Sequence, residues 1–140
     1  MRMDKLTARF QSALAEAQSL AVGMDHSMLE PEHIMLALLD QEGGGTRGLL
    51  ARAGSDVNAL RSAVGEAVDA LPKVTGQGGQ INLSNESGRV LNLTDKIAQQ
   101  RGDAYIASEL FVLAALEAKS KLSQLMHKAG VVRKSVEEAI

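Results

Sequence analysis

The sequence predicts an all-α fold of two tandem four-helix repeats, about eight helices, packed about a pseudo-two-fold axis. The segment EPEHIMLALLDQEG at 30–43 recurs as ASELFVLAALEAKS at 107–120, with Glu, Leu, Ala and Leu at matched positions. Aromatic residues make up only 2% of the 140 residues, so aliphatic side chains must fill the interior, which favours close-packed helices. Apolar residues also recur at the three- and four-residue spacings of a helix face.

The first repeat spans about residues 4–71. Its first helix runs over DKLTARFQSALAEAQSLA, where we expect Asp4 to act as the N-cap and Gly23 to end the helix. Pro31 opens the second helix, because a first-turn residue loses nothing by lacking an N–H group, and the glycines at 43–45 stop it.

The third helix of this repeat lies in GLLARAG at 48–54, with Gly54 suited to the left-handed position after a helix. The fourth helix lies at 55–71. We expect it to bury a stripe of five apolar residues: Val57, Leu60, Val64, Val68 and Leu71. Residues 72–85 are rich in glycine and polar residues and are predicted to be a linker.

The second repeat, about residues 86–140, follows the same plan. A helix at 86–100 matches the first helix, with Leu91 in the place of Leu14. The next helix is expected to open with Ser108 as its N-cap, after a loop two residues shorter than in the first copy. QLMHKAG at 124–130 matches GLLARAG, and the last helix, 131–140, stops without a capping residue. We therefore interpret the chain as a fragment of a longer protein, forming one domain over 1–140.

The second copy of the repeated helix is more apolar than the first. Leu110 stands where the first copy has His33, and residues 110–116 are apolar throughout. Such a helix is either wholly buried or lines a groove. The change from polar to apolar at a matched position favours an exposed apolar patch, in which Leu91 and Leu110 take part, with Leu93 as a weaker candidate off the main stripe.

Composition excludes several classes of function. The net charge is −2 with a pI near 5.9 and no basic stripe, so we expect no nucleic-acid partner. There is no cysteine for a disulfide, a thiolate metal site or a thiol nucleophile. No run approaches the ~18 apolar residues of a membrane span, and the N-terminus lacks a secretory signal. The sequence thus predicts a cytoplasmic domain with no membrane partner.

One segment offers an alternative from another class. DHSMLEPEH at 25–33 concentrates two histidines and three acidic residues, and a metal-dependent hydrolase using Glu30, Glu32 and His33 is conceivable from residue types alone. Neither histidine has a histidine four residues away, however, and helix capping with surface solvation explains these residues more simply. We therefore predict a non-catalytic domain with no metal and no cofactor of its own.

The order and spacing of several segments resemble a known family over essentially the whole chain. RMDKLTARFQSALAEAQSLA, EPEHIMLALLDQEGG and RVLNLTDKIAQQRGD followed by SELFVLAALE are similar to the N-terminal (Clp repeat) domain of bacterial ClpB-type AAA+ disaggregases. The resemblance implies a domain that engages apolar segments of unfolded or aggregated proteins and passes them to an ATPase ring. It also implies a homohexameric full-length protein that works with the DnaK system, with ATP and magnesium bound only in its ATPase modules.

The resemblance further implies which residues bind substrate. Leu91 and Leu110 match positions in the family's groove, and Thr7, Asp103 and Glu109 match positions on the surface around it. Thr7 and Glu109 also have purely structural interpretations, and the two acidic residues predict a preference among clients. Thr7 needs no function in a first helical turn, Glu109 is favourable at any helix start, and acids at a rim favour clients with Lys or Arg beside their apolar segments.

An alternative within the same fold is an adaptor-docking N-domain of the ClpA or ClpC type. It would hold one tightly bound protein partner, whereas a disaggregase domain would hold many weakly bound clients.

Overall fold

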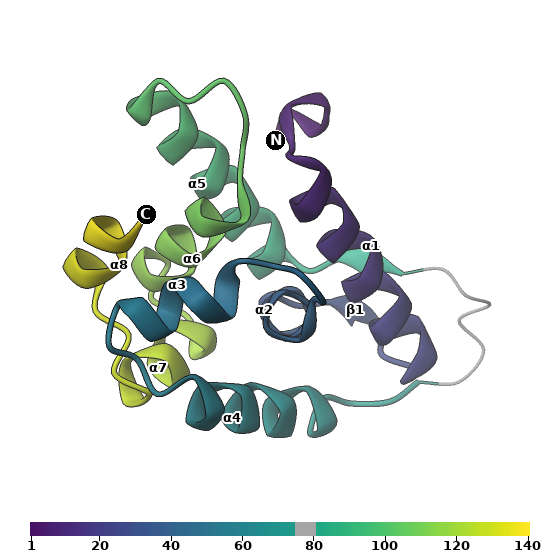
Figure 1. Cartoon of the computed structure of the whole chain (residues 1–140). Helices are drawn as coiled ribbons and strands as arrows, with labels where there is room; N and C mark the ends of the chain where they lie inside the picture. The colour runs from purple at the N-terminus through teal and green to yellow at the C-terminus, as the bar shows by residue number, and fades with distance from the viewer. Residues whose placement is uncertain (75–80) are drawn as a thin grey trace.

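In the computed structural model, residues 1–74 and 81–140 are described, and they form an all-α domain (Figure 1). In chain order the elements are η1 (Met3–Lys5), α1 (Ala8–Gly23), β1 (Met28–Leu29), α2 (Pro31–Asp40), α3 (Thr46–Arg52), α4 (Val57–Asp69), β2 (Asn82–Leu83), α5 (Asn85–Arg101), α6 (Ser108–Glu117), α7 (Lys121–Lys128) and α8 (Arg133–Ala139). The predicted all-α class and its eight helices are confirmed for this part of the chain. None of these helices is long and apolar enough to cross a membrane.

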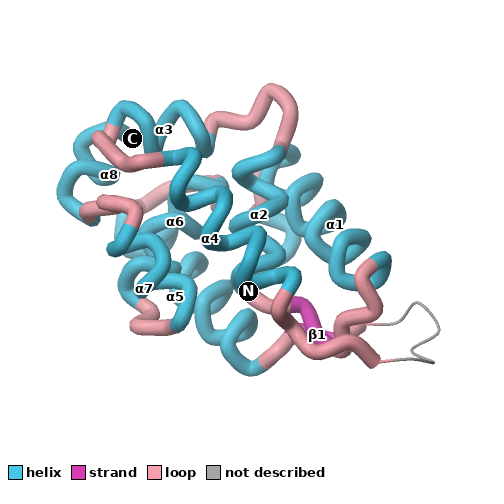
Figure 2. The backbone as a smooth tube through the Cα atoms, turned by 90° about the horizontal axis from the view of Figure 1, so that it is seen from below, coloured by secondary structure: helices cyan, strands magenta, loops and turns pink. Residues whose placement is uncertain are grey.

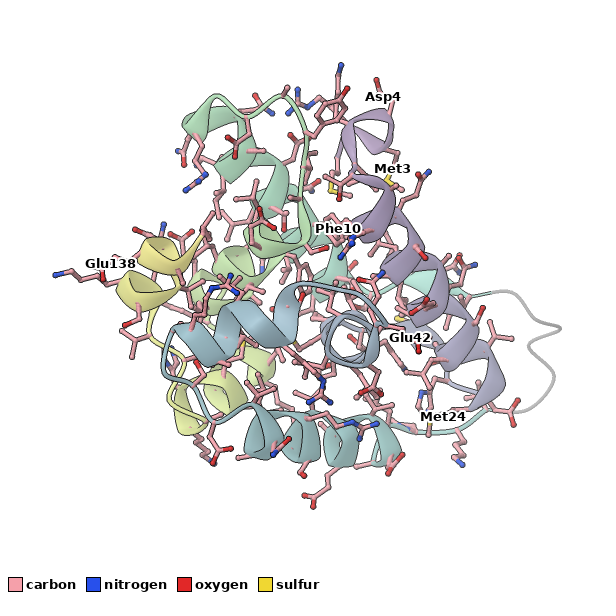
Figure 3. All side chains as sticks on the ribbon, viewed as in Figure 1. Met3, Asp4, Phe10, Met24, Glu42 and Glu138 are labelled. Atoms are coloured by element: carbon pink, nitrogen blue, oxygen red, sulfur yellow. The ribbon has the colours of Figure 1, made fainter. Side chains whose placement is uncertain are left out.

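The two copies of the repeated segment, α2 and α6, form the centre of the domain. Every residue from 31 to 39 and from 110 to 116 is buried, while α1, α4, α5 and α8 lie around them (Figures 1 and 2). Across the repeats, the rings of Phe10 on α1 and Phe111 on α6 are in contact, with their centroids 6.0 Å apart and their planes tilted by 54°, and Phe10 points inward in Figure 3. The hydrophobic core is therefore shared by the two repeats.

Two short parallel pairings join one repeat to the other. Leu6, before α1, pairs with Ile106, before α6, and Leu29, before α2, pairs with Leu83, before α5. Thr7 N–H donates to the Ile106 carbonyl at 3.0 Å, and Ser84 N–H donates to the Leu29 carbonyl at 3.1 Å. Each pairing thus joins the entry to a first helix of one repeat with the entry to the second helix of the other. This equivalence supports the predicted pseudo-two-fold arrangement.

The caps of the matched helices correct three expectations. Thr7, not Asp4, caps α1 by accepting a bond from Phe10 N–H at 3.2 Å, because the pairing of Leu6 keeps that residue extended; Asp4 lies in η1. Ala107, not Ser108, is the N-cap residue of α6, and Ser108 is the first helical residue. Thr7 and Glu30 are as far apart as Ser84 and Ala107, so the expected two-residue shortening before α6 is absent.

The helix boundaries predicted from glycine and proline residues are confirmed. Gly23 is the last residue of α1 and Pro31 the first of α2, and Gly54 and Gly130 both have positive φ, 82° and 79°, after the matched helices α3 and α7. In α4, Leu60, Val64 and Val68 are buried and Val57 is half-buried. Leu71, the last residue of the predicted stripe, is half-buried but lies beyond the end of α4 at Asp69. The entry to α4 also contacts the other repeat, since Asp56 N–H donates to the Ala129 carbonyl at 2.9 Å.

Part of the predicted linker is ordered structure. Lys73 pairs with His26, β2 lies within 72–85, and α5 begins at Asn85, one residue before the predicted start of the second repeat. Residues 75–80, the centre of that linker, lie outside the described residues. The pairing of Leu83 with Leu29 explains why a polar, glycine-rich stretch is extended here: it supplies backbone hydrogen bonds to the other repeat.

The expected apolar patch over α6 is not exposed. Leu110 and its six successors are buried, and so is His33, the residue at the matched position of α2. The exchange of His33 for Leu110 is therefore a difference in core chemistry, because the histidine is satisfied by polar partners inside the protein. Periodicity alone did not reveal those partners.

We predict that Phe111→Ala lowers the free energy of unfolding by about 3–5 kcal/mol, since it leaves a cavity beside Phe10 where both repeats meet. Tyr105→Ala is the matched control, because Tyr105 is 61% exposed, and its effect should stay within about 0.5 kcal/mol. Urea denaturation followed by circular dichroism measures both. Equal effects of the two substitutions would contradict the shared core.

Candidate functional site

A cleft of about 510 Å³ opens where the two repeats meet, between the starts of α1 and α6, helix α3 and the end of α8. Its lining combines small apolar side chains with a few polar and charged groups. The lining residues are Thr7, Ala8, Arg9, Gln41, Gly45, Thr46, Leu49, Arg52, Ala107, Ser108, Glu109, Ala139 and Ile140.

The pairing of Leu6 with Ile106 explains the position of the cleft. It sets the first turns of α1 and α6 side by side, so residues 7–9 and 107–109 line the same space. Leu49 from α3 is buried, and Ile140, at 41% exposure, stands at the other side. The cleft is therefore assembled from both repeats and exists only when they are docked.

Two of the predicted site residues meet in this cleft. Thr7 lines it while its hydroxyl oxygen caps α1, so this threonine is the N-cap of the helix and does not lie in its first turn. Glu109 lies in the first turn of α6 and is half-buried, which fits both the helix-start interpretation and a place on the cleft rim. Neither observation tests whether these residues bind substrate.

The three leucines lie in other surroundings. Leu91 on α5 is 5% exposed and Leu110 on α6 is 1% exposed, so both belong to the core in this conformation. Leu93 is half-buried and packs against the core edge. Their assignment to a client groove stays a prediction, with the added requirement that Leu91 and Leu110 must first become accessible.

The N-terminal segment lies over part of α5 and is held there by charge. Arg2 Nη2 and Nε donate to the Asp95 carboxylate at 2.7 and 3.0 Å, and Arg2 N–H donates to it at 3.0 Å (Figure 1 shows the N-terminus beside α5). The Arg2 guanidinium holds the pKa of Asp95 well below its usual range. Since Leu91 is one helical turn from Asp95, this segment lies on the same face of α5 as Leu91.

Asp103 lies outside the cleft, on the exposed loop between α5 and α6. Its carboxylate accepts a bond from Arg101 Nε at 3.1 Å, so its charge is compensated by its own neighbour. The structure therefore does not bring Asp103 and Glu109 together as lining residues of this cleft.

Sequence reasoning missed the two arginines of the cleft. Arg9 comes from the first turn of α1 and Arg52 from the last turn of α3, and neither follows a charged motif. Only the docking of the two repeats places them at one cleft, so a search for local basic runs had no signal to detect.

A buried histidine pair lies at the start of α2, on another part of the molecule. His26 Nδ1 and His33 Nε2 are 2.8 Å apart, and His33 Nδ1 accepts a bond from Glu30 N–H at 2.9 Å. With that acceptor role, a neutral His33 carries its proton on Nε2 and donates it to His26. The two residues are seven positions apart, with β1 between them, so a search for an i+4 partner could not find them.

The pair does not extend into a metal centre. Among residues 1–74 and 81–140, no group of three or more His, Cys, Asp or Glu side chains is placed to hold a metal ion. Glu32 is buried, and that burial raises the pKa of its carboxyl group. The alternative of a hydrolase using Glu30, Glu32 and His33 therefore has no converging ligand set in this structure.

Comparison with known proteins gives a consistent result. Residues 5–129 match the family of the Clp repeat (R) N-terminal domain. The whole chain is 51% identical to part of the chaperone protein ClpB of Vibrio cholerae and 47% identical to part of that of Pseudomonas putida, and it spans 16% of the length of each.

Among solved structures, the Hsp104 N-terminal domain from Candida albicans has a TM-score of 0.83 at 24% identity, covering 96% of this chain and 88% of that one. A complex of the ClpV N-domain with a VipB peptide has a TM-score of 0.78 at 23% identity, covering 96% and 84%. These two likenesses show the fold.

We predict that the histidine pair makes stability fall in mild acid. Burial, and then the charge of His26, lowers the pKa of His33 to about 4, while burial lowers that of His26 as well. Between an unfolded pKa of about 6.5 and the folded values, the unfolded chain binds protons that the folded chain does not, so the free energy of unfolding falls as pH falls.

Urea denaturation at a series of pH values measures this dependence. Because carboxylates also titrate in acid, the informative quantity is the difference between variants. His33→Leu, which introduces the residue type of Leu110, should flatten the fall above pH ~4.5. His127→Gln, at an exposed position of α7, should leave it unchanged. An unaltered slope in His33→Leu would contradict the assignment.

Proposed function

The chain belongs to the family of Clp repeat N-terminal domains, and from this premise we propose that it is the substrate-engaging domain of a ClpB-type protein disaggregase. The observation that carries the proposal is the identity of about half the residues, over the whole chain, with the N-terminal part of ClpB chaperones. In this role the domain holds apolar segments of unfolded or aggregated proteins and delivers them to an ATPase ring.

The cleft between the repeats supplies a suitable contact surface. Ala8, Leu49, Ala107, Ala139 and Ile140 present apolar surface there, and covering such surface contributes roughly 25 cal/mol per Å². Ordering a flexible client offsets much of this gain. Weak binding of many different clients is the expected result, because few polar groups in the cleft demand a particular sequence.

We assign a second, conditional role to the leucines. Leu93 is accessible at the edge of α5, whereas a client reaches Leu91 and Leu110 only when the covering structure shifts. The N-terminal segment held by Asp95 lies on the Leu91 face of α5, so its release is the simplest way to expose that face. Thr7 and Glu109 then flank the client at the cleft, and Asp103 stands further out.

The adaptor-docking alternative has one supporting observation. A ClpV N-domain of the same fold has been solved with a VipB peptide bound, which shows that this fold can accommodate one defined peptide. The two proposals differ in the number and affinity of partners: a single tight partner supports the adaptor role, and a range of weak clients supports the disaggregase role.

The proposal extends to the longer protein of which this chain is a part. We expect a cytoplasmic homohexamer that works with the DnaK system, binds ATP and magnesium in its ATPase modules, and uses the present domain without catalysis, metal or cofactor. The relatives in which this chain spans 16% of the length support the existence of such additional modules in the family.

A two-dimensional NMR titration of the domain with an unfolded, apolar-rich polypeptide tests the function. We expect shifts at Thr7, Ala8 and Glu109 around the cleft, and at Leu93, with Leu91 and Leu110 shifting if the α5 face opens. A complete absence of shifts would contradict the proposal. Leu91→Gln and Leu110→Gln are poor test variants, because each buries an unpartnered amide and destabilises the core.

We predict that Ala8→Trp, which fills the cleft from the first turn of α1, weakens client binding about tenfold or more. The matched control is Ala15→Trp, the same change at an exposed position further along α1 and away from the cleft. Fluorescence anisotropy of a labelled client measures both affinities. Equal affinities would mean that clients bind elsewhere on the domain.

A further inference from the structure

We propose that the cleft recognises a carboxylate on the bound polypeptide, so that its preferred clients are apolar segments carrying an acidic residue or a free C-terminus. The inference rests on the proposed function of the cleft as a peptide site and adds a chemical preference to it. It is carried by the unbalanced cations of the cleft and by an unused hydroxyl group beside them.

The arginines of the protein fall into two groups. Each arginine outside the cleft has a carboxylate within 4 Å, whereas the two that line the cleft, Arg9 and Arg52, have none within the described residues. Residues 75–80, TGQGGQ, contain no acidic side chain that could supply one. The paired arginines are Arg2 with Asp95, Arg47 and Arg61 with Asp40, Arg89 with Glu86, Arg101 with Asp103 and Arg133 with Glu117.

The two cleft arginines are placed to receive an anion. Arg9 donates one N–H to the Gly43 carbonyl, a neutral partner, which orients the guanidinium and leaves its charge uncompensated. Arg52 comes from the last turn of α3 and lines the same cleft. An arginine fork matches the two oxygens of a carboxylate, and such charge-assisted bonds are stronger than neutral ones.

Thr46 provides an independent indication of a polar ligand. This first residue of α3 is only 3% exposed and lines the cleft. Its hydroxyl group makes no hydrogen bond to the rest of the described chain, and the hydroxyl oxygen remains accessible to solvent. The start of α6 lies across the cleft, where Ala107 provides no side-chain cap. Uncapped N–H groups at a helix start and a free hydroxyl both favour an anionic oxygen.

Glu109 opposes the arginines but does not cancel them. It is the one acidic side chain of the lining, it forms no ion pair with a described residue, and together with Arg9 and Arg52 it leaves the lining with a net positive charge. The apolar part of the lining favours a polypeptide over a free inorganic anion. Asp103 does not contribute to the cleft, so a preference for clients with Lys or Arg has only Glu109 to support it.

Three peptides test the inference. They share one apolar segment with an amidated C-terminus and differ at a single flanking residue, Glu, Gln or Lys. We expect the Glu peptide to bind the domain about fivefold more tightly than the Gln peptide, and the Lys peptide to bind most weakly. The preference should shrink as salt is raised, because the groups are accessible to solvent. A fourth peptide, with Gln and a free C-terminus, shows whether a terminal carboxylate is accepted as well.

Matched variants locate the effect. Arg9→Gln and Arg52→Gln should each reduce the preference for Glu over Gln, and the double variant should abolish it. Arg89→Gln, on α5 and paired with Glu86, is the control and should keep the full preference. Glu109→Gln should strengthen binding of the Glu peptide, because it removes the one opposing charge.

The outcomes separate this inference from the proposed function. Failure of all four peptides to bind would overturn both. Equal binding of the Glu, Gln and Lys peptides would leave the peptide site in place and overturn the carboxylate preference. Tighter binding of the Lys peptide, or a preference that survives in the double arginine variant, would overturn it as well.

Discussion

The fold depends on the two parallel pairings that join the repeats before their helices begin. A four-helix unit of this size cannot bury the apolar faces of its own helices, and α2 and α6 are buried on every side only because each is covered by elements of both repeats. The pairings of Leu6 with Ile106 and of Leu29 with Leu83 fix how the repeats meet. They do so through backbone hydrogen bonds, which do not require a particular side chain at these points.

The cleft is a direct consequence of the first pairing. Once Leu6 and Ile106 are adjacent, the first turns of α1 and α6 must lie side by side, and helix starts concentrate N–H groups and favour negative charge. The same geometry explains why Thr7 serves both as the cap of α1 and as a wall of the cleft. The cap of α1 therefore does not prevent Thr7 from contacting a ligand in the cleft, and the two interpretations of Thr7 do not compete.

The sequence predicts those features of the molecule that depend on local chemistry. The duplication, most of the buried stripe of α4, and the glycines after α3 and α7 follow from periodicity and turn propensity. What the sequence could not supply depends on contacts between distant segments. The cap at Thr7, the His26–His33 pair and the meeting of Arg9 with Arg52 at one cleft all require the repeats to be docked. The prediction of an exposed apolar patch on α6 was wrong because a helix at the centre of a core and a helix that lines an apolar groove have the same composition.

The repeats differ in charge and burial at the two equivalent helix-start junctions, and only one of these junctions forms the cleft proposed as a binding site. In the pseudo-two-fold relation, Glu32 of the first repeat is equivalent to Glu109 of the second, and Arg9 is equivalent to Glu86. On the α2 side the matched positions are closed: Pro31 and Glu32 are buried, and burial, followed in smaller part by the charges of Glu30 and Glu86, raises the pKa of Glu32. On the α6 side Ser108 and Glu109 are half-exposed, and Arg9 stands where the other side has Glu86. Duplication therefore supplied two helix-start junctions, and the change in charge and burial at a few matched positions left one of them open to a ligand.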